Sequence, residues 1–461
     1  MMSRPSRPVA LLALLAACLA ASSCLVGPNF QPPTAEVPGA WSSPAPKSGP
    51  AALARWWDRF NDRELTALVN EAMAGNLGVQ QAAARVRQAR ASRAGAAAGL
   101  FPQVSASGSS QYTQRGEDDS NDESYQGGFD ASWEIDLFGG TRRSVEAAKA
   151  GWVAAKRDEE AARLSLAAEV AATYAQLRAF QQQATIARRN LAAQETTTAL
   201  IRRQAEAGFA SRLDLANAET QVANTRARIP TLEASARRTI HALSLLVGKP
   251  PGTLVARLAN DKPIPVMPPD IPAGLPSDLL RRRPDILSAE ANAHAATARI
   301  GVAVAELFPK FSLGAGLSQQ AVTLDDWLTT NARTTSVGPA VSWSIFQGGR
   351  IRADIRTQQA LRDESVLAYR QTVLTALQEV EDALVASAKE DERRRSLEAA
   401  LESSRRAADL ATRLYAQGQV DFLNVLEAQR SLLVAEEAVA QSTLNSTTER
   451  IALCKALGGG W

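Results

Sequence analysis

The feature that most constrains this chain is an internal repeat of about 210 residues. Leu100-Phe101-Pro102 recurs as Leu307-Phe308-Pro309, at an offset of 207 residues. The run 133–140 (WEIDLFGG) recurs, with a one-residue gap, as 343–349 (WSIFQGG). Three further pairs recur at an offset of 210: Gly208 and Gly418, Leu213 and Leu423, and Ala218 and Ala428. Landmarks in one order at nearly one offset mean that a single structural unit is written twice.

Each copy predicts the same order of elements. A helix near 76–99, and its counterpart near 283–306, ends at Leu-Phe-Pro, where the proline stops it. The two stretches that follow alternate apolar and polar residues and are rich in Ser, Gly and aromatic side chains, which is typical of strands. The expected strands are 103–114 and 126–138 in the first copy, and 310–321 and 336–347 in the second.

A very long helical run without proline follows each Gly-Gly pair, over 141–206 and over 350–416. At 1.5 Å per residue each run predicts a rod of roughly 100 Å. Gly208 and Gly418 are expected to end these helices as C-cap glycines in tight turns at the helix tips. Return helices are expected over 211–247 and 420–457. The incoming and return helices together are nearly as long as the rod, so they can stack end to end along it.

The N-terminal region predicts a secretion signal followed by a lipid anchor. Two arginines precede an apolar run over 9–21, the pattern of a secretory signal. The segment Ala-Ser-Ser-Cys24 resembles a lipobox, in which the cysteine carries a diacylglycerol and a fatty acyl group such as palmitate. Cys18 is the competing match, and Cys24 is favoured because of the segment Val26-Gly27-Pro28-Asn29-Phe30 that follows it. A plain cleaved signal or a single helical anchor is the alternative.

These signals divide the chain into five segments. They are a signal peptide (1–23), an acylated tether (24–62), the first repeat (63–248), a Pro-rich linker (249–276) and the second repeat (277–461). The tether is expected to be extended, because its proline content does not allow a helix.

Composition and motifs exclude several classes of protein. The net charge is +3, from 51 Lys+Arg and 48 Asp+Glu, which argues against a nucleic-acid partner. Arg281-Arg282-Arg283 stands before Pro284 and predicts an exposed helix start rather than a nucleic-acid patch. His241 and His294 lie singly, and with three cysteines no metal site is expected. No nucleophile elbow, phosphate loop or zinc motif is present, so we expect no catalytic residues and no enzyme.

The strand count predicts an oligomer. Beyond the N-terminus no apolar run reaches the length of a membrane helix, but barrel strands carry only an alternating signal. Two copies supply four strands, which cannot close a barrel, and unpaired strand edges are costly in lipid. Three chains would supply twelve strands and twelve helical columns. The predicted fold class is therefore mainly α with a membrane β-barrel, built from two tandem repeats and closed as a trimer on an α-helical barrel.

Together these residues resemble the TolC-type outer-membrane efflux proteins, in particular their NodT/OprM-like lipoprotein branch. The matching segments are Cys24 with Val26-Gly27-Pro28-Asn29-Phe30, 279–286 (LLRRRPDI), Leu307-Phe308-Pro309 and 455–461 (KALGGGW). The resemblance implies a homotrimeric, lipid-anchored conduit of the outer membrane that extends into the periplasm and takes part in multidrug resistance. It implies a periplasmic adaptor and an inner-membrane transporter of the resistance-nodulation-division class as partners, and no cofactor beyond the lipid. A lipid-anchored periplasmic coiled-coil scaffold or adaptor without a pore is the alternative.

The resemblance also places a gate at the helix tips, where Gly208 and Gly418 form the rim. Glu427 matches a position that is usually acidic and faces the lumen, and Asn424 matches one that is acidic in some members. Three copies of Glu427 would form a ring that attracts cations. An ordinary solvated helix residue is the other interpretation of Glu427.

Tyr415 matches the gate tyrosine of the family and Asp214 matches its acidic partner. A hydrogen bond from the phenol to the carboxylate would hold the gate shut. Val420 stands where some members have an arginine, so the salt-bridge part of that latch is missing. Plain packing is the alternative role of Tyr415. Five aromatic residues near the strands predict either a membrane-interface girdle or packing in the barrel wall: Tyr112, Tyr125, Trp133, Trp327 and Trp343.

Overall fold

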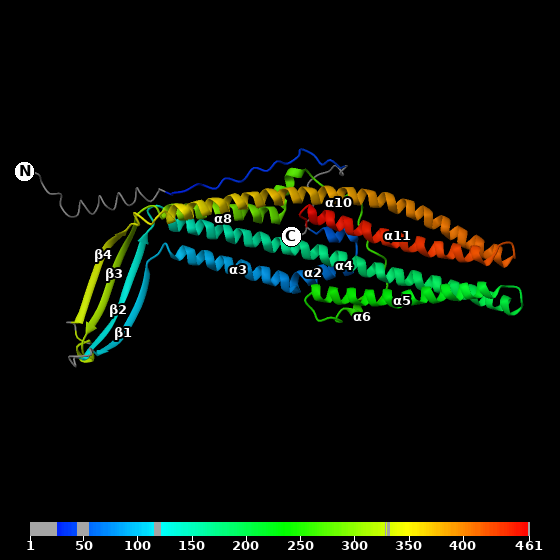
Figure 1. The fold of residues 1–461 in the computed structure, drawn as a ribbon, viewed down its shortest axis with the longest axis horizontal. Helices are drawn as coiled ribbons and strands as arrows, with labels where there is room; N and C mark the ends of the chain where they lie inside the picture. The colour runs from blue at the N-terminus through cyan, green and yellow to red at the C-terminus, as the bar shows by residue number, and fades with distance from the viewer. Residues whose placement is uncertain (1–24, 44–54, 115–120, 328, 330–331, 460–461) are drawn as a thin grey trace, which may run out of the picture. The chain divides into compact units, whose positions relative to one another are not determined.

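The repeat governs the computed structural model, which describes residues 25–43, 55–114, 121–327, 329 and 332–459. The first copy contains α3 (Leu77–Ala98), β1 (Gln103–Gln114), β2 (Asn121–Ile135), α4 (Gly140–Glu206) and α5 (Arg212–Leu246) (Figure 1). The second copy contains α8 (Pro284–Ala305), β3 (Lys310–Ala321), β4 (Arg333–Ser342), α10 (Arg350–Ala416) and α11 (Phe422–Ala456). Short elements stand outside this pattern: η1 (Trp56–Phe60), α2 (Arg63–Gly75), α6 (Val255–Leu258), η2 (Pro276–Asp278), α7 (Leu279–Arg282) and α9 (Leu324–Trp327).

Equivalent elements of the two copies have equal lengths. The incoming helices have 22 residues, the first strands 12, the long helices 67 and the return helices 35. Incoming helices and first strands are offset by 207 residues, and long and return helices by 210. The predicted mainly helical fold of two tandem repeats is therefore confirmed.

The second strand of each copy differs from its expected range. β2 begins at Asn121 rather than 126 and ends at Ile135 rather than 138. It begins earlier because its ladder with β1 continues up to the pair Gln114 and Asn121. It ends earlier because the Asp136 carboxylate accepts hydrogen bonds from the backbone amides of Thr141 and Arg142, at 3.2 and 2.8 Å, which turns the chain into α4. In the second copy β4 is likewise shifted, to 333–342 from the expected 336–347.

The chain forms two compact units. The first comprises Met1–Ala35, Ala84–Arg157 and Leu287–Thr372, and contains the sheet. The second comprises Glu36–Ala83, Asp158–Ile286 and Val373–Trp461. Four of the repeat helices (α3, α4, α8 and α10) contribute residues to both units.

The sheet of the first unit has the antiparallel order β1-β2-β3-β4, so β1 and β4 are its edges (Figure 1). Directly opposed residues of antiparallel strands point to the same face. The register pairs Phe129 with Leu317, Trp133 with Leu313, and Leu313 with Pro339. Apolar side chains from all four strands therefore share one face: Val104, Ala106, Phe129, Ala131, Trp133, Ile135, Phe311, Leu313, Ala315, Leu317, Val337, Pro339 and Val341.

The opposite face of the sheet is made of small and polar residues. One row across it consists of Ser105, Asp130, Gly316 and Ser336, and the neighbouring rows carry mostly Ser, Gln, Thr and Gly. Every residue of β4 except Gly338 is exposed, and on the apolar face large side chains such as Val337 and Phe129 are exposed as well. The sheet is therefore amphipathic, and in the part of the chain that the structure describes most of the large side chains on its apolar face are exposed.

In each copy a tryptophan near the end of the second strand bonds to the turn that precedes the first strand. The Nε1 group of Trp133 donates to the carbonyl of Leu100 at 3.0 Å, and Trp343 makes the equivalent bond to Leu307, also at 3.0 Å. The two tryptophan side chains are 37% and 56% exposed. The same Leu-Phe-Pro and Trp motifs that defined the repeat in the sequence are thus joined by one hydrogen bond in each copy.

A buried arginine joins three helices of the second unit. Arg283 is buried and its guanidinium bonds to carboxylate oxygens of Asp285 and Glu379, both at 2.6 Å, and to the carbonyl of Ala456 at 3.0 Å. The expectation that the whole 281–283 run forms an exposed surface is therefore wrong for Arg283. The reason is that its partners come from three different elements, which the local pattern of arginines cannot reveal.

None of the helices in the described part of the chain combines the length and the apolarity required to cross a membrane.

Cys454 on α11 lies in the core of the second unit, with its Sγ atom 3.9 Å from the sulfur of Met267. Burial raises the pKa of this thiol to about 12. Because thiolate is the reactive form, Cys454 should resist alkylation by iodoacetamide at pH 8 in the folded protein and react after unfolding. Mass spectrometry of the peptide that contains Cys454 measures this, and alkylation at equal rates in both states would contradict the burial.

The same raised pKa predicts an alkaline loss of stability. A thiol with a higher pKa in the folded state stabilises the protein fully below its unfolded pKa of about 8.5. That contribution is lost as the pH rises from there toward 12. The melting temperature of the wild type should therefore fall more steeply above pH 9 than that of Cys454→Ala, in which nothing titrates at this position.

Candidate functional site

The turns at the tips of the long helices share one backbone geometry. Gly208 has φ +81° and Gly418 has φ +71°, the left-handed conformation that favours glycine. The amide of Phe209 donates to the carbonyl of Gln204 at 2.8 Å, and Gln419 donates to Leu414 at 2.9 Å. These are the bonds of a Schellman motif. A Cβ atom at either glycine would meet open space, so the backbone conformation alone requires glycine there.

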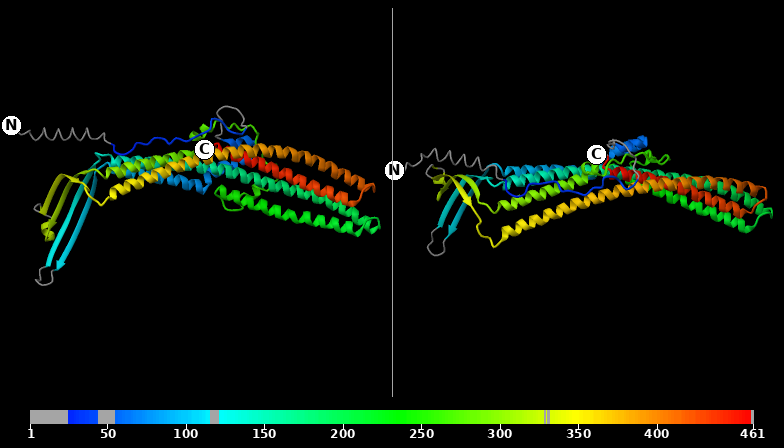
Figure 2. Two further views of the ribbon diagram at one scale, coloured as in Figure 1. Left: turned by 45° about the horizontal axis from the view of Figure 1, so that its top comes forward. Right: turned by 90° about the horizontal axis from the view of Figure 1, so that it is seen from above.

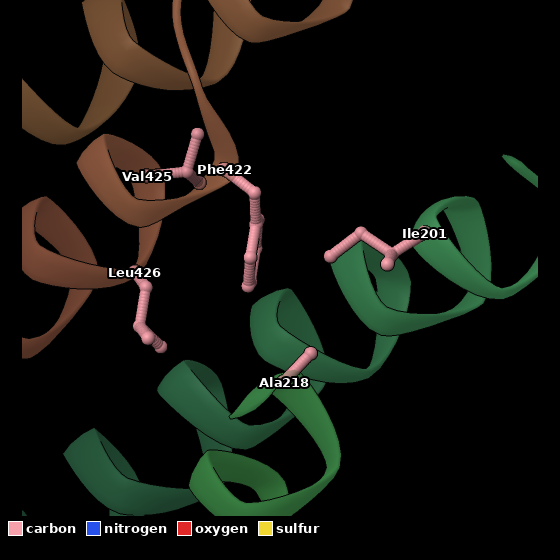
Figure 3. Packing of buried hydrophobic residues seen from close by; sticks show 5 residues of the cluster. All are labelled: Ile201, Ala218, Phe422, Val425 and Leu426. Atoms are coloured by element: carbon pink, nitrogen blue, oxygen red, sulfur yellow. The ribbon is translucent and has the colours of Figure 1, made fainter. Parts of the chain in front are cut away.

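Apolar side chains pack the two hairpins together beside these turns. Ile201 of α4 and Ala218 of α5 meet Phe422, Val425 and Leu426 of α11, and all five are buried (Figure 3). In the views of Figures 1 and 2 the α4–α5 and α10–α11 turns lie at the same end of the second unit. This cluster fixes the tip of one hairpin against the other.

Tyr415 lies at the edge of that cluster, half-buried, with its ring 5.9 Å from that of Phe422 in an edge-on contact. Its hydroxyl donates to Oε1 of Gln204 at 2.7 Å. The expected partner was Asp214, but within the chain the phenol binds Gln204. Burial first, and then the nearby charge of Asp214, raise the pKa of Tyr415, so Asp214 acts on the phenol through its field.

Sequence reasoning missed Gln204 because nothing distinguishes it in the sequence. It lies four residues before Gly208, and the equivalent residue of the second copy is Leu414. The signal that would have found it is this departure from the repeat at a position next to the turn.

Asn424 and Glu427 lie one turn apart on α11, and both are exposed. Nη1 of Arg430 is 3.8 Å from Oε2 of Glu427, with both side chains largely in solvent. Such an exposed contact is weak and leaves the carboxylate accessible. Glu427 is thus a solvated side chain in one chain, and a ring requires further copies.

The repeat relates these acidic positions in a crossed manner. At an offset of 210, Asp214 corresponds to Asn424, and Asn217 corresponds to Glu427. Each copy therefore carries one acid and one amide at this pair of positions, but in opposite order. Asp214 stands in the first turn of α5, where the Ser211 hydroxyl accepts the backbone amides of Leu213 and Asp214.

Large apolar side chains are exposed around the turns. Phe209 is 87% exposed, and Leu213 and Leu423 are exposed on the first turns of the two return helices. Leu213 and Leu423 are equivalent positions of the repeat. The tips therefore offer apolar contacts to another molecule or to another copy of the chain.

Across residues 25–43, 55–114, 121–327, 329 and 332–459, no three His, Cys, Asp or Glu side chains are arranged to hold a metal ion. Cys24 and Cys18, the two candidates for lipid attachment, lie outside the described residues.

This geometry defines a class of protein. Its members consist of two tandem repeats of helical hairpins, with an amphipathic sheet and helix tips that pack together. A family model described as outer membrane efflux protein matches residues 68–249 and 275–459, one segment for each copy of the repeat. Nodulation protein T of Rhizobium leguminosarum bv. viciae is 35% identical over 441 residues, which cover 95% of this chain and 91% of that protein.

Two further comparisons span nearly the full chain. The probable outer membrane lipoprotein SilC of Salmonella typhimurium is 30% identical, and the match covers 97% of this chain and 97% of that protein. The solved structure of the outer-membrane channel OprN has a TM-score of 0.87 and 38% identity, and the match covers 95% of this chain and 100% of that one. The chain therefore belongs to the outer membrane efflux protein family, and the predicted resemblance is confirmed.

The family places the chain in the outer membrane and identifies it as an efflux channel. The relatives described above are a nodulation protein, a probable outer membrane lipoprotein and an outer-membrane channel. The sequence allowed two interpretations, a conduit and a lipid-anchored scaffold without a pore. The similarity to a solved channel structure favours the conduit.

Removing the Tyr415 hydroxyl should destabilise the helix tips. Tyr415→Phe leaves the half-buried Gln204 amide without its donor, which costs about 1 kcal/mol. Gln204→Leu should cost a similar amount, and the double variant should cost little more than either single one, because both remove the same bond. Thermal unfolding in detergent measures these differences.

Tyr369→Phe is the matched control, because the Tyr369 hydroxyl makes no hydrogen bond to another described residue and its removal should cost less. Additive losses for Tyr415→Phe and Gln204→Leu would show that the bond does not contribute to stability.

Proposed function

We propose that three copies of this chain form a passive conduit that exports small molecules across the outer membrane. In this trimer the sheets join into a twelve-stranded β-barrel in the outer membrane, and the helices form a tunnel of twelve columns in the periplasm. An inner-membrane transporter of the resistance-nodulation-division class supplies the energy, and a periplasmic adaptor links it to the conduit. The chain itself catalyses no reaction and needs no cofactor other than its lipid.

The observation that carries this proposal is the amphipathic sheet with two open edges. Its apolar face suits lipid and its small, polar face suits a water-filled lumen. The unpaired backbone groups of β1 and β4 need partners in a membrane, where each unsatisfied group costs several kcal/mol. Pairing β1 of one copy with β4 of the next satisfies both edges, and three copies close the ring.

Lipid attachment at Cys24, with Cys18 as the alternative, would anchor each copy beside the barrel. The sequence pattern before Cys24 supports this, and so does the description of the relative SilC as an outer membrane lipoprotein. A single acyl chain binds membranes only marginally, whereas the several chains of a lipoprotein cysteine bind stably.

The helix tips would form the periplasmic gate. The bond between Tyr415 and Gln204 joins the two hairpins of one copy, and the field of Asp214 acts on the same phenol. Glu427, with Asn424 one turn earlier, would line the passage and give it a preference for cations. The rim at Gly208 and Gly418, with Phe209, Leu213 and Leu423 exposed beside it, would receive the adaptor.

The proposal is tested by the oligomeric state and by conductance. The chain extracted from outer membranes should migrate as a trimer that dissociates on heating, and it should form ion-conducting pores in planar bilayers. A scaffold without a pore would leave the membrane without detergent once Cys24→Ala removes its anchor, and it would not conduct. Such a result would overturn the conduit.

The acidic ring is tested by the charge selectivity of the pore. Glu427→Gln should lower the preference for cations, because it removes three carboxylates near one axis. Arg430→Gln should raise this preference, because it removes the neighbouring positive charge. Reversal potentials in a salt gradient measure both effects, with the exposed Glu398→Gln on α10 as the control that should change nothing.

A further inference from the structure

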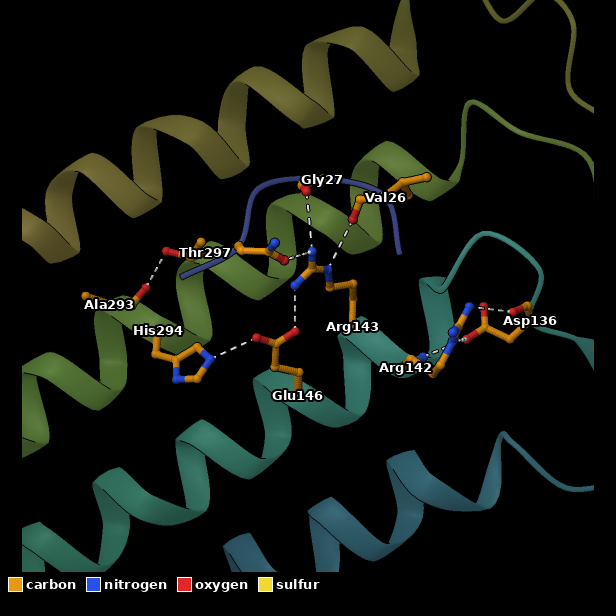
Figure 4. Close-up of polar contacts among 10 residues, drawn as sticks. Val26, Gly27, Asp136, Arg142, Arg143, Glu146, Ala293, His294 and Thr297 are labelled. Carbon is orange, nitrogen blue, oxygen red and sulfur yellow. Dashed lines mark hydrogen bonds and ion pairs between the residues drawn. The ribbon is translucent and has the colours of Figure 1, made fainter. Parts of the chain in front are cut away.

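A buried arginine at the start of α4 binds the N-terminal segment of the same chain. Arg143 is 1% exposed, and a buried guanidinium is costly unless its donors are satisfied. Its Nε atom donates to the carbonyl of Val26 at 3.1 Å (Figure 4). Its Nη2 atom donates to the carbonyl of Gly27 at 3.3 Å and to Oδ1 of Asn29 at 2.8 Å. Three of its bonds therefore go to residues that follow the proposed acylation site.

The backbone of this segment fits closely against the turn before α4 and against α8. The amide of Val26 donates to the carbonyl of Phe138, in the turn between β2 and α4, at 3.2 Å. Gly27 has φ +83°, and a Cβ atom there would lie 2.5 Å from Cα of Gly301 on α8. Only glycine allows the chain to adopt this conformation at this distance.

Phe30 completes the contact through an aromatic stack. Its ring lies 4.4 Å from that of His294, at an angle of 7°. Nε2 of His294 is 2.9 Å from Oε1 of Glu146, and the other carboxylate oxygen of Glu146 accepts from Nη1 of Arg143 at 2.8 Å (Figure 4). Glu146 thus holds together the two side chains that bind the segment.

The binding residues occur in only one copy of the repeat. The positions equivalent to Arg143 and Glu146 in the second copy are Ala353 and Arg356. The positions equivalent to His294 and Gly301 in the first copy are Arg87 and Ala94. A chain has one N-terminus and needs one such site, whereas residues that merely pack the shared fold would recur in both copies.

We propose that residues 25–30 are a docking peptide and that Arg143, Glu146, His294 and Gly301 form its binding site. The dock recognises two backbone carbonyls, the Asn29 amide, the Phe30 ring and the absence of a side chain at Gly27. It fixes Leu25, the residue that directly follows the proposed acylation site, against Gly139 in the turn between β2 and α4. Where the proposed acylation of Cys24 holds, Arg143 is a positioning residue for the lipid anchor.

The dock is tested by the mobility of a spin label on the N-terminal segment. The label is attached at Gln31→Cys, an exposed position next to Phe30, in a chain that also carries Cys454→Ala. The wild-type site should hold the label in a slowly tumbling state. Arg143→Met should convert the spectrum to a mainly fast-tumbling one, whereas Arg163→Met, which removes a partly exposed pair with Glu159 on the same helix, should not.

Variants on the peptide side keep the test independent of folding. Asn29→Ala and Phe30→Ala change only the peptide and leave the binding site intact, so they should also free the label. A synthetic peptide of residues 25–30 should then bind to these two variants but not to Arg143→Met. A slow label in the folded Arg143→Met variant would overturn the proposal. Trimer migration and conductance of the same samples report on the conduit separately, because the dock lies within one chain.

Discussion

The open hydrogen-bonding edges of β1 and β4 are the constraint on which the rest of this structure depends. A sheet of four strands with one apolar and one polar face leaves backbone groups unpaired on both sides. Within one chain nothing in the described residues satisfies them, so the fold makes sense only as part of a closed assembly. The helices serve the same need, because in each copy one incoming helix and one long helix flank the pair of strands. The incoming helices of the two copies are equal in length, and so are the long helices.

The sequence correctly predicted the helices whose ends are marked by local signals such as proline and glycine. Proline after Leu-Phe and glycine at the tips set the ends of helices, so their bounds agree with the structure within one or two residues. Local signals fail where tertiary contacts decide. β2 ends early because the Asp136 carboxylate caps the start of α4. The partner of Tyr415 was assigned by resemblance to Asp214, whereas the hydroxyl reaches Gln204, which no motif marks.

Departures from the repeat indicate which residues do more than build the fold. Trp133 and Trp343, which bond to the equivalent carbonyls of Leu100 and Leu307, occur in both copies and build the shared architecture. Gln204, Arg143 and His294 have no counterpart of the same type, and each makes a contact that exists once per chain. In a duplicated chain, comparison of the copies therefore separates scaffold from specific function without any alignment of relatives.

The crossed placement of acid and amide on the return helices has a consequence for an ion that enters the conduit. Asp214 and Glu427 occupy non-equivalent positions of the repeat, one helical turn apart along their helices. In the proposed trimer the three Glu427 carboxylates would line the passage without a second acid one turn earlier, because Asn424 stands there and Asp214 is half-buried beside Tyr415. A cation would then meet a single ring of three charges, whereas the charge of Asp214 would act on the gate.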